Sequence, residues 1–395
     1  MTNQSRFFLD HLGQTSPFPF LIEVDRAEGA YIYDKNGKAY LDMIAGVAVN
    51  NIGHRHPKVV AALSAQLEKH LHVMVYGEFI QDAQQNLVRQ LLSVLPSSLD
   101  GVYVVNSGTE AIEAALKLAK RATGRTELVA FNGSYHGSTH GAMSVSANEV
   151  KKIAFRPLLP DVRFLPHNEI PALAQITART AGVIIETIQG DAGVRRPSAA
   201  FMQALRARCT EVGALLIFDE IQCGMGRAGS MFAFEQFAVV PDLLTLGKAL
   251  GGGMPIGALV AAQQHLQLFT HAPMLGHITT FGGHPMVCAA AAATVEVLRS
   301  EIDWDLLEEQ AAAFAAQITA HPAVRAHRRV GAMFAFDLTS ADEVEKVVKY
   351  CLENGLITFW FLSHPYSFRL SPPLNLGQAD WDLAAKVIIS ALDRL

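Results

Sequence analysis

Residues 214–220 read Ala-Leu-Leu-Ile-Phe-Asp-Glu, and residues 242–248 read Asp-Leu-Leu-Thr-Leu-Gly-Lys. Both runs are apolar at nearly every position, which is typical of strands covered on both faces in a mostly parallel sheet. The first run ends at Asp219 and the second at Lys248. We therefore expect two buried strands, each of which delivers one charged side chain at its carboxyl end.

The same kind of pattern extends through the middle of the chain. Between about residues 57 and 285, helical periodicities alternate with short apolar runs. This alternation predicts an α/β domain in which helices flank a mostly parallel sheet. The expected strands are Val102–Val105, Leu128–Phe131, Val183–Ile185, Leu215–Phe218, Leu243–Leu246 and Ala258–Ala261.

The two ends of the chain follow other patterns. Turn signals at Glu28-Gly29 and Asn36-Gly37 predict short antiparallel strands within residues 21–42. After Pro285, helical patterns predominate and predict a smaller α+β domain. The elements expected there are an alanine-rich helix over 285–297, helices at 301–319, 341–354 and 379–394, and a strand at Met333–Leu338.

These patterns divide the chain into three expected parts. Residues 1–56 form an N-terminal segment whose short strands pack with the small domain. Residues 57–285 form the large domain, and residues 286–395 form the C-terminal small domain. A chain of 395 residues is long enough for two hydrophobic cores.

Composition and charge exclude several classes of protein. The formal net charge of −5 argues against nucleic acid or an anionic membrane surface as the main partner. The four cysteines form no Cys-x-x-Cys pair, so neither structural zinc nor a disulfide framework is expected. No apolar stretch reaches the ~18 residues of a membrane span, and the polar N-terminus is unlike a signal peptide. We expect a cytoplasmic enzyme without a metal ion.

Lys248 and Asp219 suit the cofactor pyridoxal 5′-phosphate. A lysine amine forms a Schiff base with the cofactor's aldehyde, and a carboxylate keeps the pyridine nitrogen protonated. At 4 Å and an effective dielectric of about 20, such a carboxylate contributes ~4 kcal/mol, or roughly three pKa units. In the alternative interpretation, Asp219 caps the next helix and Lys248 is a surface lysine. A P-loop is excluded, because Ala249 follows Lys248 where that motif requires Ser or Thr.

A phosphate site is predicted where the strand Val102–Val105 leads into a helix. Ser107 and Glu110 have the spacing of a capping box, and Gly124 marks the end of the helix. Backbone amides at a helix start, together with the hydroxyls of Ser107 and Thr109, suit a phosphate group. An ordinary capped helix is the alternative interpretation.

Tyr135 and His136 follow another expected strand and a turn. An aromatic side chain in this position can stack on a pyridine ring. The alternative interpretation is a buried aromatic residue next to a histidine that is satisfied within the core.

Taken together, these residues resemble the class III pyridoxal-phosphate-dependent aminotransferases of fold type I, closest to the acetylornithine and ornithine aminotransferase group. The resemblance covers nearly the whole chain, and nine short motifs in the same order make it specific. These motifs are residues 34–42, 53–57, 106–111, 135–137, 186–193, 218–222, 226–227, 247–248 and 279–285.

The resemblance implies a role for each matching residue. Lys248 is the Schiff-base lysine, and Asp219 is the partner of the pyridinium nitrogen. Tyr135 stacks on the ring, and Gln222 bonds near the ring hydroxyl. The phosphate is bound by Gly108 and Thr109, and by Thr280 of the neighbouring subunit, which implies a homodimer with shared active sites. The full set of cofactor-binding residues so implied is Ser107, Gly108, Thr109, Tyr135, His136, Glu186, Asp219, Gln222, Lys248 and Thr280.

The resemblance also bears on the substrates. The segment Ala45–Val49 looks like acetylornithine aminotransferases, and the absence of a tyrosine near Val47 disfavours free ornithine. Arg369 matches the arginine that binds the α-carboxylate of glutamate. Asp191 occupies the place of the acid, usually Glu, that is paired with this arginine while an ω-amine is bound.

Two positions depart from the family pattern. Ser138 replaces an arginine that commonly binds a substrate carboxylate, and Thr187 replaces the usual proline. We therefore expect an ω-aminotransferase that moves an amino group from an acetylornithine-like or other ω-amino donor to 2-oxoglutarate, giving an aldehyde and glutamate. A donor such as 4-aminobutyrate, lysine or a diamine, or an aminomutase reaction of the same fold, remains open.

Overall fold

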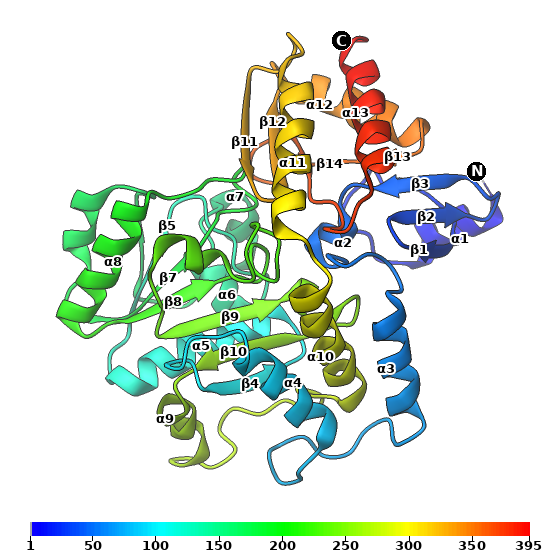
Figure 1. Ribbon diagram of the computed structural model, residues 1–395. Helices are drawn as coiled ribbons and strands as arrows, with labels where there is room; N and C mark the ends of the chain where they lie inside the picture. The colour runs from blue at the N-terminus through cyan, green and yellow to red at the C-terminus, as the bar shows by residue number, and fades with distance from the viewer. Residues whose placement is uncertain (1) are drawn as a thin grey trace.

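The computed structural model describes residues 2–395 and contains three sheets with helices packed around them (Figure 1). The largest sheet has seven strands and lies between layers of helices. Two four-stranded sheets lie beside it, one built mainly from the N-terminal strands and one from the C-terminal part. No helix within residues 2–395 combines the length and the apolar character that a membrane crossing requires.

The central sheet has the order β4-β10-β9-β8-β7-β5-β6. Every strand runs in one direction except β10, which is antiparallel to both of its neighbours. The mostly parallel sheet predicted from the apolar runs is therefore confirmed, and β6 is an additional edge strand. The strands are β4 (Gly101–Val105), β5 (Glu127–Phe131), β6 (Val162–Leu165), β7 (Thr180–Glu186), β8 (Leu215–Asp219), β9 (Leu243–Gly247) and β10 (Gly257–Ala261).

Alternating side chains of these strands enter two separate hydrophobic clusters, one on each face of the sheet. In β8, Ile217 packs in the cluster of helix α5 (Gly108–Thr123), whereas Leu216 and Phe218 pack in the cluster of helix α8 (Ala199–Val212). Both faces are thus covered, which explains why the strands are apolar at every position.

The N-terminal strands form an antiparallel meander that a strand from near the C-terminus extends. Gly29 and Gly37 adopt positive φ angles of 58° and 84° in the turns that the sequence predicts. Strand β13 pairs in parallel with β3 and so connects residues 39–42 with residues 356–357. The strands of this sheet are β1 (Val24–Glu28), β2 (Tyr31–Asp34), β3 (Ala39–Asp42) and β13 (Leu356–Ile357).

The third sheet lies in the C-terminal part of the chain and has the order β11-β12-β15-β14. The predicted strand Met333–Leu338 is found as β12, but the other three strands were missed because they are short and not clearly alternating. Its strands are β11 (Ala326–Val330), β12 (Met333–Asp337), β14 (Phe359–Trp360) and β15 (Ser367–Leu370).

The predicted helices of this part are found close to their expected limits, and the proposed domain limits at 56/57 and 285/286 stay a prediction. The C-terminal helices are α10 (Pro285–Ser300), α11 (Trp304–Thr319), α12 (Ala341–Glu353) and α13 (Gln378–Leu392). The remaining helices are α1 (Asn3–His11), α2 (Ala45–Ala48), α3 (Pro57–Leu67), α4 (Asp82–Leu92), α6 (His140–Val145), α7 (Glu149–Lys152) and α9 (Gln263–Leu266).

Arg227 ties three distant parts of the chain together. Its guanidinium is fully buried and donates to the carbonyls of Ala332, at 3.1 Å, and Pro372, at 2.6 Å, and to the side chain of Asn51. Because a buried charge requires hydrogen-bond partners, these bonds fix the C-terminal sheet relative to the loop after β8. The side chains of β15 thereby take a defined position beside the central sheet.

Candidate active site

The predicted site residues collect at one edge of the central sheet. Strands β4, β5, β7, β8 and β9 all run in the same direction, so their carboxyl ends lie at this edge. Glu186 ends β7, Asp219 ends β8, and Lys248 directly follows β9. The crevice outside the carboxyl ends of such strands is the usual ligand site of an open α/β sheet.

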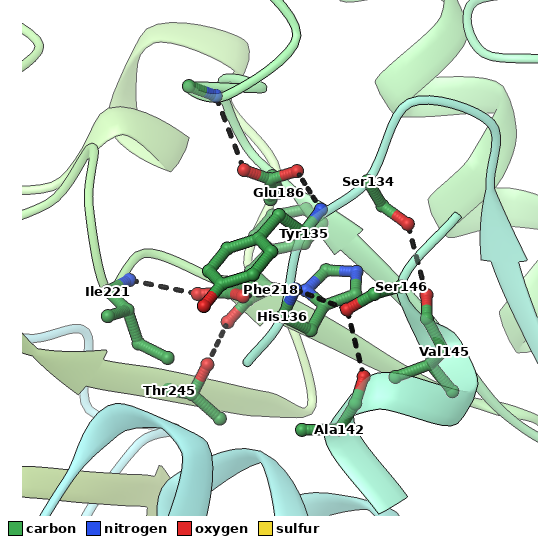
Figure 2. A network of polar contacts seen from close by, with 12 residues as sticks. Ser134, Tyr135, His136, Ala142, Val145, Ser146, Glu186, Phe218, Ile221 and Thr245 are labelled. Carbon is green, nitrogen blue, oxygen red and sulfur yellow. Dashed lines mark hydrogen bonds and ion pairs between the residues drawn. The ribbon is translucent and has the colours of Figure 1, made fainter. Parts of the chain in front are cut away.

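The carboxylate of Asp219 is held by two donors, one of which is the amide of Ile221, labelled in Figure 2. One oxygen accepts from the ring of His136 at 2.6 Å, and the other accepts from the amide of Ile221 at 3.0 Å. An ionised carboxylate only accepts hydrogen bonds, so Nδ1 of His136 carries the proton in this contact. The amide of His136 in turn donates to Ser146 at 2.9 Å. Asp219 is followed by turns and no regular helix, so helix capping does not account for its position.

Lys248 has the environment that a reactive amine needs. It begins a short 3-10 helix, Lys248–Gly251, with a φ angle of 44°, a left-handed conformation that costs energy for any residue other than glycine. Burial lowers the pKa of Lys248 below its usual range, and the carboxylates of Asp219 and Glu186 act in the opposite direction. A lowered pKa favours the neutral amine, which is the nucleophilic form.

Glu186 lies beside Asp219 in the register of β7 and β8. Burial, assisted by the negative charge of Asp219, raises the pKa of the Glu186 carboxyl well above its usual range. Its two oxygens accept from the amides of Tyr135, at 3.0 Å, and Gly190, at 3.2 Å. Glu186 therefore fixes the loop that carries Tyr135 and His136 over the edge of the sheet.

The N-terminus of α5 opens toward the same edge. Ser107 caps this helix by accepting from the amide of Glu110 at 3.3 Å. The carboxylate of Glu110 does not complete the expected capping box, because it accepts from the amide of Asn106 at 2.7 Å, one residue before the cap. The amides of Gly108 and Thr109 are the first two of the helix and have no carbonyl one turn back, so they can bind an anion.

Glycines create the space around this helix start. A Cβ atom on Gly108 would lie 2.7 Å from Ile221, and one on Gly247 would lie 3.2 Å from the Cα of Gly108. A Cβ atom on Gly257 would collide with the carbonyl oxygen of Ser107. The backbones of α5, β9 and β10 thus approach each other closely beside Lys248. A tight cradle of free amides next to a lysine and a carboxylate fits the phosphate, aldehyde and ring nitrogen of pyridoxal 5′-phosphate.

Three other predicted residues have different surroundings. The hydroxyl of Thr109 lies 2.8 Å from that of Thr139. The hydroxyl of Tyr135 lies 3.3 Å from that of Ser138, the serine found where an arginine was expected. Gln222 lies directly against Gly190, whose missing side chain leaves it room. Their positions near the edge of the sheet agree with the prediction, and their roles toward the cofactor stay proposals.

Thr280 is not brought to the site of its own chain. It is exposed and, among residues 2–395, makes no hydrogen bond with the other predicted site residues. This position agrees with, but does not test, the expectation that it serves a neighbouring subunit.

Arg369 and Asp191 are close enough for their charges to interact but do not form an ion pair. Arg369 lies on β15 and is 6% exposed, with its Cζ 5.6 Å from the ring centroids of both Phe359 and Phe361. Burial lowers the pKa of Arg369, and the charge of Asp191 opposes this effect. Within residues 2–395, no carboxylate oxygen lies within 4.0 Å of a nitrogen of the Arg369 guanidinium, which is the limit for an ion pair. The pairing of these two residues that the resemblance implies is therefore absent from this conformation.

Two residues near the site were missed from the sequence. Glu220 directly follows Asp219 and is fully buried, where its carboxyl accepts from the amides of Ala233, at 2.8 Å, and Phe234, at 2.6 Å. Lys151 lies 3.6 Å from Asp191. A charged residue at the end of an apolar run was a signal for Glu220, whereas nothing in the local sequence marks Lys151.

Comparisons with known proteins agree with this geometry. The family model described as Aminotransferase class-III matches residues 13–392. The acetylornithine aminotransferase of Archaeoglobus fulgidus is 37% identical over 376 residues, covering 93% of this chain and 95% of that protein. The [LysW]-aminoadipate semialdehyde/glutamate semialdehyde transaminase of Sulfurisphaera tokodaii is 39% identical over 280 residues, 71% of each protein.

The fold also has close counterparts among solved structures. The ornithine aminotransferase of Toxoplasma gondii superposes with a TM-score of 0.91 at 28% identity, covering 100% of this chain and 96% of that one. Another structure of that enzyme shows partial occupancy of pyridoxal phosphate at its active site. These matches confirm the fold class, the family resemblance and the cofactor that the sequence predicts.

Glu220 gives a prediction for the stability of the protein. Burial raises the pKa of the Glu220 carboxyl to about 8, above its ordinary value of 4.5. Between these values the unfolded carboxyl is ionised while the folded one keeps its proton, so the free energy of unfolding falls as pH rises. Between pH 5.5 and 7.5 we expect the ionisation of Glu220 to lower the free energy of unfolding by about 2 kcal/mol. Urea unfolding followed by fluorescence measures this loss.

The variant Glu220→Gln is the control for this effect. Its side chain cannot ionise and keeps only one of the two bonds to backbone amides, so it is less stable than the wild type at pH 5.5. Its free energy of unfolding should depend less on pH between 5.5 and 7.5. Equal pH dependence in the two proteins would contradict the assignment of a raised pKa to Glu220.

Proposed function

The chain belongs to the class III aminotransferases, which use pyridoxal 5′-phosphate, and from this premise we propose that it moves the ω-amino group of an acetylornithine-like donor to 2-oxoglutarate. The products are an aldehyde and glutamate. The observation that carries the choice of acceptor is the buried guanidinium of Arg369, which has no carboxylate partner within residues 2–395.

The bound cofactor supplies an aldehyde that captures amines and a ring that stores the electrons of a broken C–H bond. Lys248 would hold the aldehyde through its amine, whose pKa burial lowers below its usual range. With the cofactor bound, the amine of Lys248 would also serve as the base that moves a proton at the substrate carbon.

Asp219 supports the protonated ring nitrogen in this proposal. His136 orients the carboxylate through the 2.6 Å hydrogen bond, and the amide of Ile221 holds the other oxygen. Gly108, Thr109 and Ser107 bind the phosphate, and Tyr135 covers the ring.

Arg369 recognises the carboxylate of the acceptor. A guanidinium binds a carboxylate through two parallel hydrogen bonds, and the guanidinium of Arg369 is buried, with its Cζ 5.6 Å from the ring centroids of Phe359 and Phe361. Because low dielectric strengthens these bonds, an acceptor that carries a carboxylate, such as 2-oxoglutarate, gains more here than a neutral oxo compound.

The donor is less closely defined by the chain itself. Relatives named acetylornithine aminotransferase support an acetylated ω-amino acid as donor, and the S. tokodaii transaminase, named for aminoadipate semialdehyde and glutamate semialdehyde, supports an aldehyde product. Ser138 offers a hydroxyl in place of a cation, which favours a donor without a strong requirement for a charged end. The alternatives are 4-aminobutyrate, lysine or a diamine, and an aminomutase that needs no acceptor.

We also propose a homodimer with shared active sites. Exposed apolar side chains gather on two segments, 71–80 and 274–281, which together line a cavity of about 740 Å³. A patch of this kind on a protein surface marks an interface. The segment 274–281 includes Thr280, so a partner that covers it could receive the hydroxyl of that residue at its phosphate site. The exposed apolar residues are Leu71, Met74, Phe79, Ile80, Met274, Leu275, Ile278 and Phe281.

A reducing compartment such as the cytoplasm is proposed for the same protein. All four cysteines are free and buried in the structure, which suits an environment where thiols stay reduced.

The proposed reaction can be tested by its stoichiometry. Purified protein with N-acetylornithine and 2-oxoglutarate should form glutamate and aldehyde in equal amounts, and should form neither when the acceptor is omitted. Lys248→Ala should abolish turnover, because no other amine takes its place. Product formation without an acceptor would indicate an aminomutase, and normal multiple turnover by Lys248→Ala would refute the assignment of this lysine.

Asp219→Asn should keep the cofactor but lose most of the rate. An amide cannot stabilise the ring proton, so we expect turnover to fall by roughly a hundred- to a thousandfold. The measurement is glutamate formation at saturating cofactor, with retained cofactor counted from the absorbance of the desalted protein. Asp305→Asn, on the exposed face of α11, is the matched control. Near wild-type turnover by Asp219→Asn would contradict the role of this carboxylate.

Met274→Glu should separate the proposed dimer, because it replaces an apolar side chain that is 77% exposed with a charged one. Light scattering should report a monomer, and the monomer should lose cofactor faster than the wild type because Thr280 of the partner subunit is missing. Val150→Glu, at a side chain that is 88% exposed elsewhere, should remain dimeric. A dimeric and fully active Met274→Glu would place the interface elsewhere.

A further inference from the structure

Among residues 2–395, Arg369 is a buried cation without a counter-ion. Its Nε atom is buried and has no hydrogen-bond partner there, and its Cζ lies 5.6 Å from the centroids of two aromatic rings. Buried cations in proteins are normally paired, because an unpaired one loses its hydration without compensation. The absence of a partner for Arg369 therefore needs a physical cause.

The carboxylate that could neutralise Arg369 has other partners. Asp191 is 4% exposed, and its charge opposes the effect of burial, which lowers the pKa of Arg369. Its Oδ2 accepts from the hydroxyl of Ser363 at 2.6 Å, and its Oδ1 accepts from the amide of Leu362 at 3.2 Å. The ammonium of Lys151 lies 3.6 Å from Oδ2. Two hydrogen bonds and one cation thus engage both oxygens of Asp191.

Lys151 is placed for this internal contact. Although 37% of its side chain is exposed, its Nζ atom is buried and makes no hydrogen bond. It lies 5.8 Å from the ring centroid of Tyr135. Because the charged atom itself is shielded from water, its interaction with Asp191 is screened less than that of a surface pair.

One residue connects both supports of Asp191. Asn148 caps α7 by accepting from the amide of Lys151 at 3.4 Å, and its side-chain amide donates to the hydroxyl of Ser363 at 3.2 Å. The start of α7 therefore positions both the cation and the hydroxyl that hold Asp191.

We propose that Lys151 and Ser363 act as positioning residues that hold Asp191 away from Arg369, so that the guanidinium stays open to a substrate carboxylate. The proposal rests on the proposed function insofar as Arg369 serves the acceptor. A dicarboxylate then binds without first breaking an ion pair between Arg369 and Asp191. The specificity for carboxylates depends in this way on a lysine that does not touch the substrate.

Lys151→Met tests this inference in the holoenzyme. Removal of the ammonium leaves Arg369 as the cation that attracts Asp191, so the two residues should form an ion pair. Asp191 then competes with the ligand for the guanidinium. We expect the Kd for glutarate, measured by titration calorimetry, to rise roughly fivefold, the effect of one partly screened ion pair. Glutarate has no oxo or amino group, so it reports on carboxylate binding without turnover. Lys386→Met, on the exposed face of α13, is the matched control.

The background variant Asp191→Asn separates positioning from direct contact. If Lys151 acts through Asp191, Lys151→Met should have no further effect on glutarate binding once Asp191 is Asn. The KM for 2-oxoglutarate should rise with Lys151→Met in parallel with the Kd for glutarate, while the KM for the amino donor stays unchanged. Ser363→Ala should shift the glutarate Kd in the same direction, and it replaces Lys151→Met if that variant does not fold.

Three results would overturn the inference. They are an unchanged glutarate Kd in Lys151→Met, a loss of equal size in the Asp191→Asn background, and no glutarate binding by the wild-type protein. The second result would mean that Lys151 contacts the ligand itself. A wild-type protein that binds glutarate but does not use 2-oxoglutarate would refute the proposed acceptor, and the binding measurements would still decide the inference.

Discussion

The buried hydrogen bond between His136 and Asp219 is the contact on which the rest of the site depends. It joins the loop after β5 to the end of β8 and holds a charged carboxylate beside a second one, Glu186, in the next strand. Two adjacent acids in a buried site repel each other, and the raised pKa of Glu186 relieves that repulsion. Glu186 then binds the amide of Tyr135, so the electrostatic arrangement also fixes the loop that covers the site.

Much of the fold could be predicted because local sequence patterns indicate its main elements. Strands such as β8 are buried on both faces and therefore apolar at every position, and helix ends such as Gly124 carry their own stop signals. The short strand β15, which carries Arg369, gives no such signal, because it has only four residues and its neighbour β12 precedes helix α12 in the chain. Pairing with distant segments determines whether such a segment forms a strand, and local propensity does not.

The site was predictable only in part for the same reason. Asp219 and Lys248 could be predicted at the ends of β8 and β9, because each is a charged residue at the end of an apolar run. The close approach of Gly257 to Ser107 depends on β10 lying between β4 and β9, an order that no local pattern contains. The contacts of Asp191 with Lys151 and Ser363 likewise join three segments that are distant in sequence. The family resemblance pointed to Asp191 and Arg369, but only the structure shows that these two residues do not form an ion pair.

The most direct test of the site is the visible absorbance of the purified protein during addition of N-acetylornithine and then 2-oxoglutarate. We expect a band from the cofactor bound to Lys248, loss of this band with the amino donor, and its return with the oxo acid. A protein that shows no such band after added pyridoxal 5′-phosphate would contradict the assignment of Lys248 and Asp219. A band that the donor removes but 2-oxoglutarate does not restore would contradict the role given to Arg369.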